Sequence, residues 1–145
     1  MGTVSGQVVV FNVNEEMELI GGTQAVWRFP PQGVEGSPGV YSAPVLEGDT
    51  LYIGEFRDDG RVYALDVETG VMRWQQSAEG RIVGAPVLAG ELLLVGSEDG
   101  SLYAFQAEDG TRKWRFPTEG KVWSTPAVSG DTVYFGSMDH AIYAV

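Results

Sequence analysis

The sequence contains no cysteine, few basic residues, a single histidine and no long apolar run. Without cysteine, the chain can form neither a disulfide, a thiolate nucleophile nor a cysteine-ligated metal site. Only 9 lysine and arginine residues stand against 20 aspartate and glutamate residues, and the formal net charge of −11 repels nucleic acid and anionic lipid. No stretch approaches the ~18 consecutive apolar residues that a membrane-spanning helix requires. These absences argue against a nucleic-acid partner and a membrane span, and they leave the redox compartment open.

The residues that are abundant indicate a globular domain with many turns. Glycine occurs 20 times and proline 7 times in 145 residues, while 43% of the residues are hydrophobic. Glycine is spaced too closely for repeated helices, because each glycine inside a helix costs about 1 kcal/mol. Between the glycines lie short runs rich in Val, Leu, Tyr, Phe and Trp, which is the signal of β-strands.

The second half of the chain repeats itself with a period of about 40 residues. Residues 61–100 align with residues 101–140 without a gap, a further cycle begins at 141, and a looser copy precedes them. That earlier copy contains insertions at 14–20 and 33–39. Identical residues recur in the two aligned units at Tyr63/Tyr103, Ala64/Ala104, Gly70/Gly110, Trp74/Trp114, Pro86/Pro126 and Gly96/Gly136.

Each repeat predicts four antiparallel strands. A proline in the first strand (Pro44, Pro86, Pro126) indicates an edge strand beside a central channel, because proline lacks an amide donor. The second and third strands are nearly continuous apolar runs, as expected of strands buried on both faces, and the fourth alternates tryptophan with polar residues. We therefore predict an all-β fold, a single partial β-propeller domain over residues 1–145 with units at about 7–60, 61–100 and 101–140 and another starting at 141.

The segment RVYALDVETGVMRW resembles the repeat of pyrroloquinoline quinone (PQQ) enzymes and their cofactor-free relatives, with Ala64, Asp66, Thr69, Gly70 and Trp74 at the family positions. The next unit departs from this pattern at two positions, with Gln and Asp in place of Asp and Thr. A WD40 propeller is the alternative, and it fails because no Trp-Asp pair occurs. The resemblance implies an incomplete ring of about three and a half blades in which tryptophans dock between blades. The implied docking residues are Trp27, Trp74, Trp114, Gly70 and Gly110.

No catalytic, cofactor-binding or metal-ligating residue is assigned. Most of the acidic residues fall in turns, and His140 stands alone in a turn without a nucleophile or a second histidine. We expect no cofactor, and PQQ with calcium is expected only if the chain is part of a complete ring. Three aromatic residues outside the repeated skeleton are the candidates for contact with a ligand or partner: Trp123, Tyr41 and Phe56.

Three functions remain open at this stage. The preferred one is a non-catalytic module in protein–protein interaction or scaffolding; the alternatives are a fragment of a PQQ-dependent dehydrogenase and the sensor domain of a larger regulatory protein. An arc of blades leaves an apolar face bare at each end, so we expect a protein partner, other copies of the chain in a homo-oligomer, or a longer parent chain. Relatives implied by the resemblance are periplasmic or extracytoplasmic, and this chain has no recognisable signal peptide, so the compartment stays open.

Overall fold

The structure is a computed structural model that describes residues 8–10, 27–29 and 39–145. The insertion at 14–20, and all of the insertion at 33–39 except Gly39, lie outside these residues. The described strands form four sheets. They are β1 (Val8–Val10) and β2 (Trp27–Phe29); β3 (Val45–Glu47), β4 (Thr50–Gly54), β5 (Arg61–Asp66) and β6 (Met72–Ser77); β7 (Val87–Ala89), β8 (Leu92–Gly96), β9 (Ser101–Gln106) and β10 (Arg112–Pro117); β11 (Ala127–Ser129), β12 (Thr132–Gly136) and β13 (Ile142–Ala144).

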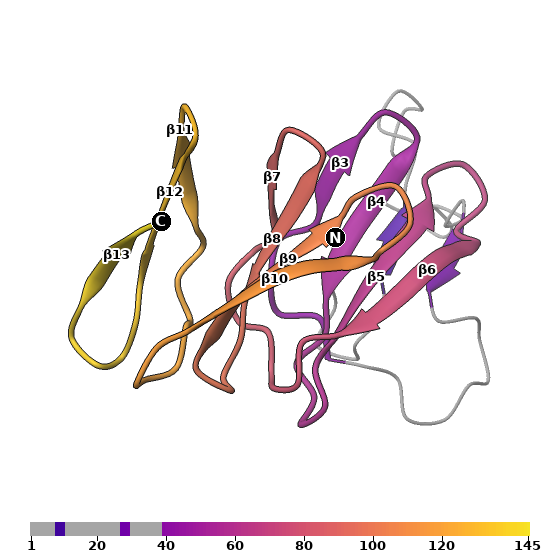
Figure 1. Ribbon diagram of the computed structural model, residues 1–145. Coiled ribbons are helices and arrows are strands. Elements are labelled where there is room, and N and C mark those ends of the chain that lie inside the picture. Colours follow the sequence, from indigo (N-terminus) through magenta and orange to yellow (C-terminus); the bar gives the residue numbers. More distant parts are fainter. Residues whose placement is uncertain (1–7, 11–26, 30–38) are drawn as a thin grey trace, which may run out of the picture.

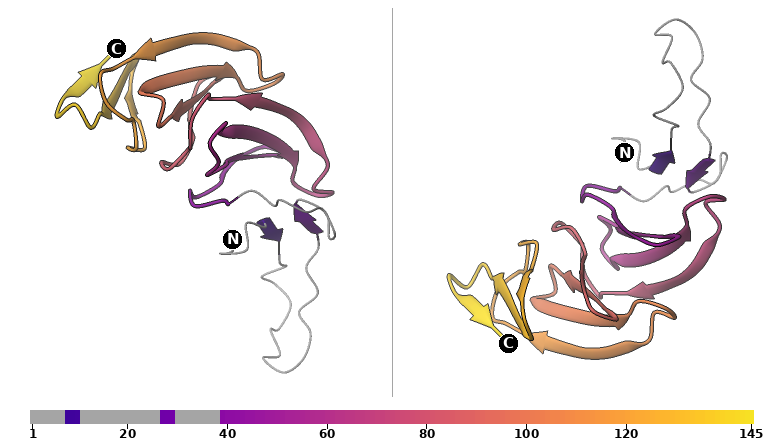
Figure 2. Two further views of the ribbon diagram at one scale, coloured as in Figure 1. Left: turned by 90° about the horizontal axis from the view of Figure 1, so that it is seen from below. Right: turned by 90° about the horizontal axis from the view of Figure 1, so that it is seen from above.

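The four sheets follow one another in an arc. Within each sheet the strands are antiparallel and lie in chain order, so the connections inside the three sheets from β3 to β13 are hairpins. Figure 2 shows the sheets fanned side by side, with β1 and β13 at opposite ends of the arc. This arrangement confirms the prediction of antiparallel, propeller-like blades. Within the described ranges, no helix has the length and apolar character needed to cross a membrane.

The hydrophobic core lies between the sheets rather than within any one of them. All residues of β4 are buried, as are the central residues of β5 and nearly all of β9, because these strands are covered by a sheet on either side. The outer strand β6 buries only Trp74. Three separate apolar clusters fill the three gaps between consecutive sheets; they are centred on Leu65 and Ile53, on Tyr103 and Phe105, and on Leu94 and Phe135.

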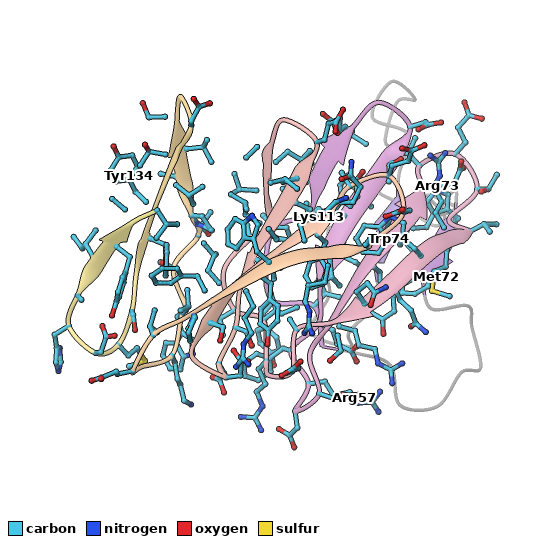
Figure 3. The ribbon with its side chains drawn as sticks, in the orientation of Figure 1. Arg57, Met72, Arg73, Trp74, Lys113 and Tyr134 are labelled. Carbon is cyan, nitrogen blue, oxygen red and sulfur yellow. The ribbon has the colours of Figure 1, made fainter. Side chains whose placement is uncertain are left out.

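The last sheet differs from the expectation that its middle strand is buried on both faces. Val133 and Phe135 of β12 pack toward the preceding sheet, whereas Tyr134 between them is 44% exposed. Side chains alternate along a strand, and in the described part of the chain no further sheet covers the second face. Figure 3 shows Tyr134 at the end of the arc away from Trp74.

The recurrent prolines also differ slightly from the expectation. Pro44, Pro86 and Pro126 each stand one residue before the innermost strand of a sheet rather than inside it. A residue before the strand does not have to donate a ladder hydrogen bond, so proline is accommodated there without loss.

The turn between β5 and β6 is held by one carboxylate. Asp66 Oδ1 accepts hydrogen bonds from the amides of Glu68 and Thr69 and from Thr69 Oγ1, and Arg73 Nη2 donates to Asp66 Oδ2 at 2.7 Å. The hydrogen bond from Arg73, followed by those from Thr69, lowers the pKa of Asp66 far below its usual range.

This turn predicts a pH-dependent stability. A carboxyl group whose pKa is lower in the folded state stabilises the fold above its unfolded pKa of about 4, and this contribution is lost as the pH falls below that value. We expect the urea midpoint of unfolding to fall between pH 5 and pH 3 by less in the Asp66→Asn variant than in the wild type. Urea titrations at several pH values measure this, with Glu68→Gln as a control that removes the same charge from the same turn. Equal pH dependence in all three proteins would contradict the assignment.

Candidate interaction site

Two indole side chains join consecutive sheets. Trp27 Nε1 donates a hydrogen bond to the Val67 carbonyl at 2.7 Å, and Trp74 Nε1 donates to the Ala107 carbonyl at 2.9 Å. Each indole also lies against a glycine of the next sheet. Gly70 and Gly110 have φ values of +71° and +76°, and a Cβ on either would lie 2.6 or 2.7 Å from the tryptophan ring. Glycine is therefore required there by both backbone conformation and space.

The loops at one end of the sheets bring the aromatic candidates together. The β4–β5 and β8–β9 turns and the segments before β3, β7 and β11 all meet at this end, which is the lower end in Figure 1. The rings of Tyr41 and Phe56 contact each other with centroids 4.7 Å apart. The guanidinium of Arg81, from the β6–β7 connection, lies 5.2 Å from the Phe56 ring centroid.

Charged side chains continue this line to Trp123. Arg81 lies 3.9 Å from Glu98, and Glu98 accepts hydrogen bonds from Lys121 Nζ at 3.2 Å and from Trp123 Nε1 at 3.0 Å. The Lys121 ammonium is also 5.5 Å from the Trp123 ring centroid. We call this connected set the rim row; its members are Tyr41, Phe56, Arg81, Glu98, Lys121 and Trp123. Tyr41 and Trp123, at its two ends, are 68% and 42% exposed.

The Phe56 loop is fixed by a buried carboxylate. Tyr63 Oη donates to Glu55 Oε2 at 2.7 Å, and Arg57 lies 3.5 Å from Glu55 Oε1, while the side chain of Glu55 is fully buried. Burial, reinforced by the hydrogen bond to Glu55, raises the pKa of Tyr63. The other units have the small residues Ser97 and Ser137 at this position and a shorter turn. The longer loop, anchored by Glu55, is what presents Phe56 beside Tyr41.

Sequence reasoning named Tyr41, Phe56 and Trp123 but missed the charged residues that connect them. Arg81, Glu98 and Lys121 were passed over because charged residues in turns are ordinarily solvated. One signal was available, since Arg81 and Lys121 occupy the same position in consecutive repeats. The single histidine lies apart from the rim row contacts, exposed in the β12–β13 turn with a φ of +71°.

The described residues do not fit a calcium–quinone centre. Such a centre needs carboxylate oxygens that converge on one cation. In residues 8–10, 27–29 and 39–145, no three histidine, aspartate or glutamate side chains are placed to hold a metal ion. Several carboxylates instead serve the turns, as Asp99 does by accepting hydrogen bonds from Tyr103 and Arg115, and Asp139 by accepting one from Tyr143. We assign no chemistry through such a group.

Successive antiparallel sheets, arranged in an arc and joined by indoles, define a segment of a tryptophan-docking β-propeller. The model of the family described as "Outer membrane protein assembly factor BamB" matches residues 6–145. The chain belongs to this family. No curated protein sequence matches the chain significantly.

Solved structures share the fold at low sequence identity. BamB from Moraxella catarrhalis has a TM-score of 0.78 and 20% identity over 99% of this chain and 41% of its own. The computationally designed Ika4 protein has a TM-score of 0.76 and 15% identity, over 99% of this chain and 81% of its own. The quinohemoprotein alcohol dehydrogenase ADHIIG from Pseudomonas putida HK5 has a TM-score of 0.61 and 22% identity, over 69% of this chain and 17% of its own. The present chain thus spans less than half the length of that BamB.

Proposed function

We propose that this chain is a non-catalytic propeller module that binds a protein partner along the rim row. The observation that carries the proposal is the unbroken line of contacts from Tyr41 to Trp123, which crosses three sheets at one end of the arc. Aromatic residues and arginine are enriched in protein–protein interfaces and contribute most of their hot spots. The partial exposure of Tyr41 and Trp123 leaves aromatic surface available to a partner.

The electrostatics of the rim row favour a polypeptide ligand over a highly charged one. Glu98 and the neighbouring Asp58 balance the charges of Arg81 and Lys121 in the centre of the row, so neither sign of charge dominates there. The family description names an assembly factor, which is consistent with a role in bringing proteins together. The alternative role in a quinoprotein dehydrogenase lacks a suitable donor set among the described residues.

Site-specific photo-crosslinking tests this function. A benzophenone amino acid at position 41 or 123 keeps an aromatic group in the rim row, and the same group at Met72 is the matched control. Met72 is also exposed, at 44%, but lies on the outer strand β6 (Figure 3). In an extract of the source cells, we expect positions 41 and 123 to crosslink to one common protein that mass spectrometry identifies, and position 72 to give no such adduct.

A second variant connects the adduct to the rim row itself. Arg81→Ala removes the contact between the aromatic pair and Glu98 while leaving the sheets intact, and we expect it to reduce the yield of both adducts several-fold. The proposal fails if the adducts at positions 41 and 123 match those at position 72, or if no protein adduct forms at either rim position.

A further inference from the structure

The rim row is built on one backbone arrangement that occurs three times. In each case an amide in the turn between the second and third strands of a sheet donates to a carbonyl in the segment that leads into the same sheet. The three bonds run from Phe56 to Gly39 at 2.6 Å, from Glu98 to Arg81 at 3.0 Å and from Met138 to Lys121 at 2.9 Å. We call each bonded pair, together with the residue two positions after its carbonyl, a rim slot. This third member is Tyr41 in the first slot, Val83 in the second and Trp123 in the third.

Buried backbone fixes the order and the spacing of the slots. Ile82 and Val122, which follow the carbonyl residues of the second and third slots, are fully buried. Their amides donate to the carbonyls of Glu55 and Ser97, in the turns of the preceding sheets, at 3.1 and 3.0 Å. Each slot is therefore bonded to the slot before it, and a partner meets the side chains of the row in a constant order.

The two outer slots present apolar surface. In the first slot, Tyr41 is largely exposed and its ring contacts that of Phe56. In the third slot, Trp123 Nε1 already donates to Glu98, so the exposed part of the indole offers a partner its ring rather than a donor. Val83 in the middle slot is a half-buried aliphatic residue. The row thus places aromatic rings in its first and third slots and none in its second.

The middle of the row presents hydrogen-bond donors. The side chain of Glu98 is only 12% exposed, whereas those of Arg81 and Lys121 are 41% and 47% exposed. Guanidinium and ammonium groups donate hydrogen bonds and accept none, so a partner has to supply acceptors here. A carboxylate of the partner gains little, because Asp58 already pairs with Arg81 and Glu98 with Lys121. Neutral acceptors, such as backbone carbonyls and side-chain amides, fit this part of the row best.

We propose that the rim row binds one uncharged stretch of its protein partner in a fixed order. An apolar side chain lies against Tyr41 and Phe56, neutral hydrogen-bond acceptors face Arg81 and Lys121, and a second apolar side chain lies against Trp123. This proposal rests on the proposed function and adds the chemistry of the partner to it. The order matters because an apolar side chain over the middle slot covers the two cations and leaves their donors without acceptors.

Mapping the crosslinks tests the chemistry of the partner. With the benzophenone amino acid at position 41 and, separately, at position 123, tandem mass spectrometry locates the attachment site on the common adduct. We expect both sites to be apolar residues of one stretch with no charged residue between them. We also expect the adduct yields to change by less than about twofold between about 0.05 M and about 0.5 M NaCl, because salt screens contacts between exposed charges.

An exchange between slots tests the order. The double variant Tyr41→Val with Val83→Tyr keeps the composition of the chain but moves a ring from the first slot to the second. With the benzophenone at position 123 as the reporter, we expect the adduct yield to fall at least about fivefold, whereas the control Tyr41→Phe stays within about twofold of the wild type. Urea unfolding checks that each variant is folded, and Tyr41→Val alone replaces the exchange if the double variant does not fold.

Three results would overturn the proposal and leave the proposed function in place: attachment sites in separate or charged parts of the partner, adduct yields that fall steeply with salt, and an exchange variant that crosslinks as the wild type does. The absence of a protein adduct at both rim positions of the otherwise unchanged chain is a different result, and it would overturn the proposed function and this proposal together.

Discussion

Replacing Trp74 by alanine is expected to lower the free energy of unfolding by about 3–5 kcal/mol. The indole is only 8% exposed, contacts Tyr52 and donates to the Ala107 carbonyl of the next sheet. The variant therefore loses apolar burial, opens a cavity between two sheets and removes one of two side-chain hydrogen bonds to the Ala107 carbonyl, the other coming from Tyr52 Oη at 3.2 Å. Urea unfolding followed by circular dichroism at 218 nm, a wavelength typical of β-sheet, provides the measurement.

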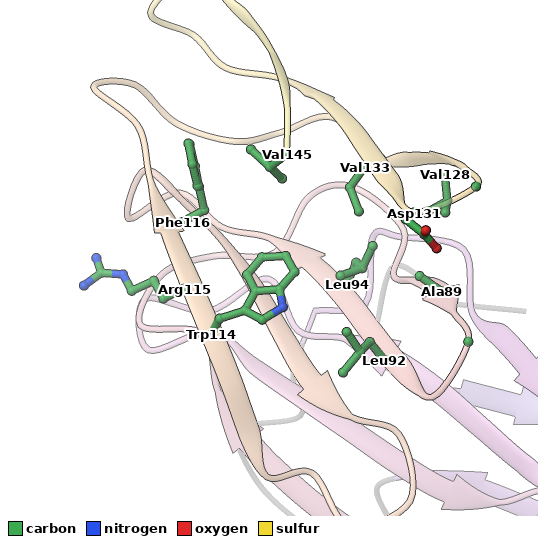
Figure 4. A pocket seen from close by; sticks show the side chains of 12 residues that line it. Ala89, Leu92, Leu94, Trp114, Arg115, Phe116, Val128, Asp131, Val133 and Val145 are labelled. Atoms are coloured by element: carbon green, nitrogen blue, oxygen red, sulfur yellow. The ribbon is translucent and has the colours of Figure 1, made fainter.

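The matched control is Trp114→Ala, which removes the same side chain from the same position in the next repeat. Because the Trp114 indole borders a hollow (Figure 4) and donates to no described residue, we expect a loss below about 2 kcal/mol. Equal losses in the two variants would show that the contacts to Ala107 and Gly110 contribute little, and would contradict the account of how the sheets are joined.

Replacing Gly110 by alanine is expected to cost about 2–4 kcal/mol. The residue has a φ of +76°, which an L-amino acid adopts at a cost of about 1 kcal/mol or more. The added Cβ would also lie 2.7 Å from ring atoms of Trp74, so the indole must shift and weaken its hydrogen bond. The free energy of unfolding of this variant measures both effects together.

Gly90→Ala separates the two effects. Gly90 has a similar φ of +58°, but nothing lies within 4 Å of the position of its Cβ. At Gly90 only the cost of the left-handed backbone conformation remains, and we expect the free energy of unfolding to fall by about 1 kcal/mol. If the two variants unfold at the same urea concentration, the close approach of Gly110 to the Trp74 indole does not contribute to stability. The interpretation that this contact joins the two sheets is then wrong.

The repeat made the fold predictable to an unusual degree. The spacing of Trp74 and Trp114, together with the apolar runs between glycines, predicted antiparallel four-stranded units and the burial of the middle strands. These features are local, because a few consecutive residues determine both the side-chain alternation of a strand and the turn that follows it. The exposure of Tyr134 agrees with the bare face expected at the end of an arc, whereas the apolar run of its strand alone predicts burial on both faces.

The candidate site was harder to predict from the sequence than the fold. Tyr41, Phe56 and Trp123 were recognised as departures from the repeat, but their connection through Arg81 and Glu98 joins loops from different units. Such contacts follow from the angle at which sheets succeed one another, which no sequence period specifies. The buried Glu55 was overlooked for a different reason: its partner Tyr63 lies in the same hairpin, but a glutamate beside a turn ordinarily predicts a solvated side chain.

Because the core lies between the sheets, it determines how such a protein can gain or lose repeat units in evolution. Among the residues that the structure describes, each apolar cluster belongs to two adjacent sheets and none extends over three, so the core of every sheet packs against its immediate neighbours. Stability in such an array is approximately a sum over units and the boundaries between them. Duplication or loss of one whole unit therefore preserves the remaining boundaries, whereas a deletion of a few residues inside a unit disturbs two of them. Gene duplication in steps of a single unit is the growth that this architecture tolerates best.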